Sequence, residues 1–197
     1  MNKLSLDRQS HIVKALCEGN SIRSTARMTG VAVNTVVKLL VDLGEACLAY
    51  QDETMHDLRL SRIQVDEIWS FVYAKEKNIP ASKKGAFGVG DVWTFTAIDA
   101  ETKLVPCWLV GQRDAGHAFE FIDDLRQRLA NRVQLTTDGH KMYLEAVEGA
   151  FGSEVDYAML VKVYGAEPEG EVRYSPAKCL AAEKHPIQGN PDPAYIS

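Results

Sequence analysis

Residues 65–72, VDEIWSFV, constrain the fold of this chain more than any other stretch. β-Branched and aromatic side chains flank two adjacent carboxylates, Asp66 and Glu67, and that composition is typical of a strand inside a sheet. Aspartate is disfavoured in strands, and a buried carboxylate is costly unless it is paired or binds a metal. The sequence therefore predicts a strand over residues 63–73 in which a carboxylate has a function.

The first forty residues predict three short helices. Apolar residues at helical spacing indicate a first helix that stops at Gly19 and Asn20. Ser21 can cap a second helix, which Gly30 ends. A third helix follows, and we expect it to hide an apolar stripe formed by Val33, Val36, Val37 and Leu40.

Three short helices joined by tight turns are typical of a helix-turn-helix. Ala26 is small where the second helix must approach the third, and Gly30 allows a left-handed turn. Residues 1–40 hold six Lys or Arg against two acidic residues, whereas the whole chain carries −5. The positive charge of this end therefore favours binding to the phosphates of nucleic acid. A small helical dimerisation bundle is the alternative. The candidate DNA-binding residues are Arg23, Asn34, Thr35 and Lys38.

Residues 1–60 are thus interpreted as a helix-turn-helix domain with a helical linker, and residues 61–197 as a second domain. From Ser61 the apolar period becomes strand-like. The expected strands are 63–73, 92–98, 104–110, 133–137 and 155–164, and the expected helices are 115–130 and 142–151. The order β-β-β-α-β-α-β is that of an α/β, ribonuclease H-like fold.

In that fold the first and fourth strands are neighbours, so Asp66 and Asp138 would converge. Two close carboxylates repel each other unless a cation neutralises them. Mg²⁺, or Mn²⁺ in its place, is a hard cation that suits carboxylate and phosphate oxygens and supports phosphodiester chemistry. An alternative for Asp138 is a simple Asp-Gly turn. Strand alternation sends Glu67 to the other face, where we expect it to support the structure or to pair with a base such as Arg62 or Lys162.

VDEIWSFV followed by LTTDGHKMY, behind a helix-turn-helix, resembles the DDE transposases of bacterial insertion sequences, and most closely the family named after insertion sequence one. The resemblance implies metal-dependent hydrolysis at element ends and then strand transfer by the freed 3′-hydroxyl. It also implies double-stranded DNA at element ends and target DNA as partners, and a homo-oligomer when active. Asp66 matches the first catalytic, metal-binding aspartate and Asp138 the second, with His140 beside it.

The family also carries a glutamate on a later helix, and this chain lacks a clear equivalent. Five of its seven prolines follow Tyr164, and no amphipathic helix with a glutamate comes after them. We expect Glu183 to lie on a short apolar turn, too early in the chain to match the glutamate of the family. We therefore expect a ribonuclease H-like domain that ends before that helix, with impaired strand transfer. The alternatives are a helix-turn-helix transcriptional regulator without catalysis and a nuclease that does not transpose DNA.

Composition sets the remaining limits. No apolar run approaches the ~20 residues of a membrane span, and no signal-peptide pattern is present, so we expect a cytoplasmic protein with no membrane partner. The four cysteines stand at least 30 positions apart without a CxxC pair. This spacing gives a zinc finger no support and favours buried thiols in a reducing compartment.

Overall fold

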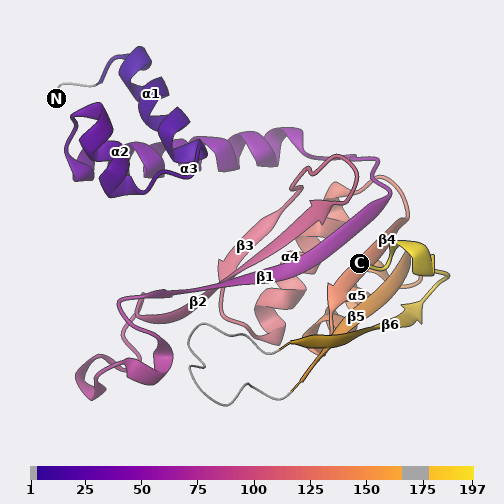
Figure 1. Ribbon diagram of the computed structural model, residues 1–197. Coiled ribbons are helices and arrows are strands. Elements are labelled where there is room, and N and C mark those ends of the chain that lie inside the picture. The colour runs from indigo at the N-terminus through magenta and orange to yellow at the C-terminus, as the bar shows by residue number, and fades with distance from the viewer. Residues whose placement is uncertain (1–3, 166–177) are drawn as a thin grey trace. The chain divides into compact units, whose positions relative to one another are not determined.

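The computed structural model describes residues 4–165 and 178–197 of the chain, which divides into two compact units, Met1–Thr54 and Met55–Ser197 (Figure 1). The first unit holds the helices α1 (Leu6–Cys17), α2 (Ile22–Thr29) and α3 (Val33–Thr54). Among the described residues, no helix is both long enough and apolar enough to cross a membrane.

The core of the first unit is small. Ile12, Ala26 and Val36, one from each helix, are buried together. The Ser21 hydroxyl accepts the Ser24 backbone N–H at 3.2 Å and so caps α2. Gly30 ends the same helix with φ 66°, a left-handed conformation that glycine adopts without a Cβ clash.

The expected apolar stripe of the third helix is wrong. Val36 is buried, but the other three members of that stripe, Val33, Val37 and Leu40, are exposed. Helices α1 and α2 instead pack against Val36 and Leu39 of α3. The reason is that two short helices cover only one narrow side of a 22-residue helix. Helix α3 also runs on to Thr54, through the first part of the expected linker.

The second unit is a mixed α/β structure with one six-stranded sheet of order β3-β2-β1-β4-β5-β6. Strand β1 is parallel to β4, and β4 is parallel to β5, whereas the pairs β1/β2, β2/β3 and β5/β6 are antiparallel. The bounds are β1 Arg62–Val72, β2 Gly90–Asp99, β3 Trp108–Gly111, α4 Ala115–Arg128, β4 Val133–Asp138, α5 Met142–Phe151, β5 Val155–Tyr164 and β6 Cys179–Gln188, with short 3₁₀ turns η1 Glu76–Asn78, η2 Ala81–Lys83 and η3 Pro193–Tyr195.

Helices α4 and α5 pack on one face of this sheet and build the main core. Ile63 and Val65 alternate along β1 and are buried in that core, so Gln64 and Asp66 point to the opposite face. Phe121 and Tyr143, from the two helices, are among the largest buried side chains. The core therefore fixes which face of β1 each carboxylate can reach.

Two further expectations need correction. The segment expected to be a short apolar turn around Glu183 is the strand β6, which pairs antiparallel with β5. Its side chains are largely exposed, so it lacks the apolar alternation that reveals a half-buried strand. Of the four cysteines only Cys107 is buried; Cys17, Cys47 and Cys179 are exposed, and all four are free thiols.

Candidate active site

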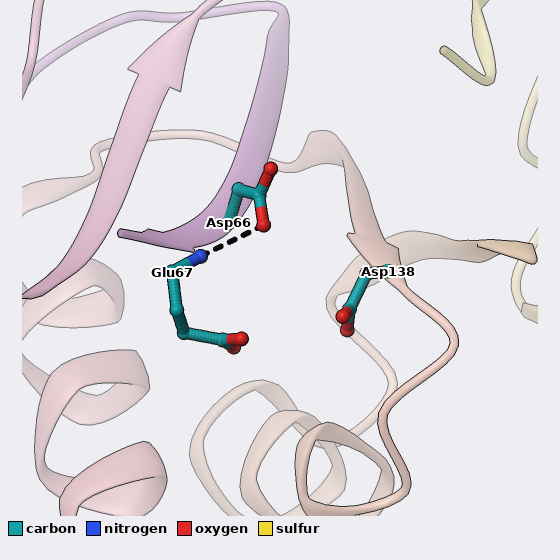
Figure 2. Close-up of side chains that lie close together, drawn as sticks. All are labelled: Asp66, Glu67 and Asp138. Carbon is teal, nitrogen blue, oxygen red and sulfur yellow. Dashed lines mark hydrogen bonds between the residues drawn. The ribbon is translucent and has the colours of Figure 1, made fainter. Parts of the chain in front are cut away.

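Three carboxylates meet where β1 and β4 lie side by side. Asp66 and Glu67 come from the middle of β1, and Asp138 is the last residue of β4. One oxygen from each of the three lies within 4.8 Å of the others (Figure 2). The structure thus brings together the two aspartates that the sequence singled out, and it adds Glu67 to them.

Backbone N–H groups of neighbouring residues hold the carboxylates of Asp66 and Asp138 in place. Asp66 Oδ1 accepts the N–H of Glu67 at 2.8 Å, the bond drawn in Figure 2. Asp138 Oδ1 accepts the N–H of His140 at 2.9 Å, which is the Asp-Gly turn expected after a strand. The turn and the cluster therefore coexist, because the turn uses one carboxylate oxygen of Asp138 and leaves Oδ2 for other partners.

Glu67 is the buried member of the cluster, with its side chain 1% exposed. Arg113 donates to its Oε2 from Nε at 3.1 Å and from Nη2 at 2.9 Å. The Tyr143 hydroxyl donates to its Oε1. Burial, together with this bond to Glu67, raises the pKa of Tyr143 well above its usual range, so the hydroxyl keeps its proton.

Arg113 joins Glu67 to Asp138. Its Nη2 also donates to Asp138 Oδ2 at 3.2 Å, and its guanidinium lies 4.7 Å from the centre of the Trp93 ring. One planar cation thus contacts two carboxylates and an aromatic face, which is a geometry that lysine cannot reproduce. Arg113 therefore supplies the positive charge that a cluster of three acids requires.

The expected partners of Glu67 are wrong. Arg62 pairs with Glu101, and Glu67 takes Arg113 instead. Arg113 and Tyr143 stand 46 and 76 residues from Glu67, so no local pattern connects them. Strand alternation did place Glu67 on the face opposite to Asp66, and that was the one signal that it needed a partner of its own.

A cavity of about 750 Å³ opens on the side of Asp66. Asp66 and Asp138 line it together with Gln64, Thr96, Thr136, His140, Lys162 and Ser197. Residues near Ser197 reach this face, because Gln64 Nε2 donates to the Ser197 carbonyl at 3.0 Å. Its wall also includes apolar residues such as Ile98 and Leu160, and its volume gives room for a phosphate-bearing ligand beside the two aspartates.

The donor set suits a hard divalent cation. Asp66 is exposed, and the Asp138 side chain is 37% exposed, so both can offer oxygens to Mg²⁺ or Mn²⁺. Glu67 differs in burial, since its side chain is 1% exposed and accepts hydrogen bonds from Tyr143 and Arg113 inside the core. Asp66 and Asp138 are therefore the residues that would hold an ion, and Glu67 would support them through Arg113. Glu183 lies elsewhere, on β6, where His185 contacts it at 3.2 Å.

The candidate DNA-binding residues all belong to the first unit. Arg23 lies on α2, and Asn34, Thr35 and Lys38 lie on the first turns of α3. Arg23, Asn34 and Lys38 are exposed, whereas Thr35 is partly buried. Lys38 Nζ forms an exposed ion pair with Asp42 at 3.0 Å, a contact that a phosphate could replace at little cost.

No protein-family model matches the sequence, and no curated protein matches it. Among solved structures, the chain is similar to a Mos1 transposase paired-end complex with the left transposon end, at 13% identity and a TM-score of 0.31. It is also similar to a pre-cleavage Mos1 transpososome, at 11% identity and a TM-score of 0.30. These alignments cover 79% and 80% of this chain but 60% of each Mos1 chain. Likeness at this level carries no argument about function, which depends on the site itself.

Proposed function

We propose that this chain is a DDE-type DNA transposase that cuts and joins phosphodiester bonds with the help of Mg²⁺ or Mn²⁺. The observation that carries the proposal is the convergence of Asp66 and Asp138 from adjacent parallel strands, at the wall of a 750 Å³ cavity. The strand order and the alternation of helices and strands also suit a ribonuclease H-like domain. The sequence motifs resemble those of the insertion-sequence-one family.

The residues of the cluster have two different roles, binding the ion and orienting the residues that bind it. Asp66 and Asp138 would hold the ion, which would supply activation of a water or 3′-hydroxyl and stabilisation of the leaving oxygen. Arg113 orients the Asp138 carboxylate through Nη2, and Glu67 in turn holds Arg113. Gly139 approaches Val161 so closely that a Cβ there would lie 2.9 Å from a Val161 methyl group, which suits the tight turn that aims Asp138.

DNA recognition is assigned to the helix-turn-helix in the first unit. Arg23, Asn34, Thr35 and Lys38 would contact element-end DNA, with Asn34 reading a base edge and Lys38 meeting a phosphate. Target DNA would reach the cavity beside Asp66. We further propose that the protein works in the cytoplasm and as a homo-oligomer, since strand transfer joins more than one DNA end.

The test is a cleavage assay on pre-nicked element-end DNA with Mg²⁺ or Mn²⁺. Asp66→Asn and Asp138→Asn should each lower the rate by ~10²-fold or more, because an oxygen ligand with its charge is lost. Asp123→Asn is the matched control, since Asp123 lies on α4 and accepts a hydrogen bond from the Gln127 side chain at 2.7 Å. Metal-independent DNA binding without any cleavage would instead support a transcriptional regulator.

A further inference from the structure

The paired strands β1 and β2 extend beyond the rest of the sheet. They stay in register up to Val72 and Gly90, but β4 pairs with β1 only over residues 62–64, and β3 pairs with β2 only over residues 93–96. Residues 70–92 therefore have no third strand, and Figure 1 shows them leading away from the sheet to η1 and η2. Together with Ile68 and Trp69, which lie beside the last residues of β2 that pair with β3, they are here called the arm. A hairpin without a third strand is marginally stable alone.

Large apolar side chains are exposed along this arm. They are Ile68, Trp69, Phe71, Val72, Tyr73 and Phe87. Trp69 and Phe71 lie on one face of β1 with ring centres 5.6 Å apart. Exposed apolar groups gathered in one place mark a binding surface more often than scattered ones do.

Lysines lie over the aromatic rings of the arm. Lys75 Nζ is 4.6 Å from the Trp69 ring centre, and Lys83 Nζ is 4.2 Å from that of Tyr73. Residues 75–90 hold four lysines and one glutamate, in a chain whose net charge is −5. Lysine is depleted from the cores of protein–protein interfaces, so a second copy of the chain fits this surface poorly. Exposed rings of β1 and the residue after it, with ammonium groups from the following turns beside them, suit bases and phosphates.

We propose that the arm binds single-stranded DNA, with Lys75 and Lys83 on phosphates and the rings of Trp69, Phe71 and Tyr73 against unpaired bases. Binding by the arm stands by itself; its use in transposition rests on the proposed function. Strand rise of ~3.3 Å per residue puts Val72 about 20 Å from Asp66 along β1. A DNA strand held between Trp69 and Val72 would therefore lie about 10–20 Å from Asp66 along β1.

The test measures binding of the full chain to a 20-nucleotide single strand and to the matching duplex by fluorescence anisotropy at several NaCl concentrations. The double variant Lys75→Gln/Lys83→Gln should weaken single-strand binding about tenfold at low salt. It should also reduce the slope of log affinity against log NaCl concentration by ~1.4, or ~0.7 for each lost phosphate contact. Trp69→Leu keeps an apolar side chain and should weaken single-strand binding by a further ~5-fold or more.

The control variant is Lys103→Gln/Lys184→Gln, because both lysines lie outside the arm and each donates to a backbone carbonyl. Crosslinking of an iodouracil-containing single strand, followed by peptide mapping, should label residues 69–87. Equal losses in the control and arm variants, or labels confined to residues 1–54, would overturn the proposal. So would a dimer that Trp69→Leu dissociates while single-strand affinity stays unchanged. Binding by the arm without any cleavage activity would leave this proposal standing and count against the proposed enzyme.

Discussion

Arg113 donates two hydrogen bonds to the buried carboxylate of Glu67, at 3.1 and 2.9 Å. The same guanidinium reaches Asp138 at 3.2 Å. A buried acid thus controls, through one arginine, the orientation of a more exposed acid at the cavity. Arg113 therefore has two opposed effects on a divalent ion at this site. It orients the Asp138 carboxylate that would bind the ion, and its own positive charge repels the ion.

Arg113→Gln should bind Mn²⁺ more tightly and cleave DNA more slowly. Losing a positive charge within a few Å of Asp138 should raise Mn²⁺ affinity by about tenfold, while a less well oriented Asp138 should lower the cleavage rate by ~10-fold or more. Electron paramagnetic resonance of free Mn²⁺ measures the affinity without any catalysis. A purely structural arginine would lower both quantities together.

Two further variants separate charge from orientation. In Arg113→Gln/Glu67→Gln the local net charge equals that of the original chain, so Mn²⁺ affinity should return towards its original value while cleavage stays slow. Arg126→Gln is the matched control, because Arg126 pairs with Glu154 at 2.9 Å and lies 5.8 Å from the Phe151 ring centre. An affinity change in that control as large as in Arg113→Gln would contradict the prediction.

Tyr143→Phe should destabilise the second unit by about 1–3 kcal/mol, because it leaves Oε1 of the buried Glu67 without its donor. Tyr157→Phe is the comparison, since the hydroxyl of Tyr157 shares a 2.9 Å hydrogen bond with the neutral hydroxyl of Thr137. Urea unfolding gives both free energies. A smaller loss for Tyr143→Phe than for Tyr157→Phe would show that Glu67 does not depend on this bond.

The second unit should lose stability in acid through Asp156. Hydrogen bonds from the Arg132 side chain, at 2.8 and 2.7 Å, hold the pKa of Asp156 below its usual range. A lowered folded-state pKa stabilises the fold above the unfolded value of ~3.9, and this contribution is lost as the pH falls through the folded-state value. Urea unfolding between pH 7 and pH 2.5 measures it.

Asp156→Asn is the variant that isolates this contribution. It should be less stable than the original chain at pH 7, and the two free energies of unfolding should approach each other below about pH 4. A difference that is constant over the whole pH range would mean that the Asp156 carboxylate has the same proton affinity in the folded and unfolded states.

DNA binding by the first unit should depend on salt and on Lys38. Lys38→Ala should reduce the slope of log affinity against log salt by about one unit on duplex DNA. Asn34→Ala should relax sequence preference with a small change in that slope. Titrations of duplex element-end DNA at several salt concentrations test both predictions. An affinity that does not change with salt concentration would rule out phosphate contacts.

Much of the fold was predictable because its signals are local. The helix ends at Ser21 and Gly30 follow from capping and from left-handed backbone, and the strands β1, β4 and β5 follow from their apolar runs. Strand β6 was missed, since an exposed edge strand with Pro186 has no apolar alternation. The stripe on α3 was mispredicted because periodicity shows which residues share a face, but not whether another helix covers it.

The sequence by itself determined that Asp66 stands in a strand and Asp138 at a strand end, since strand composition and the Asp-Gly turn are encoded within a few residues. Only the tertiary structure decided that Glu67 joins them, with Arg113 and Tyr143 as its partners. Those contacts depend on how the segment after β3 and the helix α5 pack against β1. Such packing is set by the whole core, because a buried carboxylate takes whichever donors the surrounding elements bring within reach.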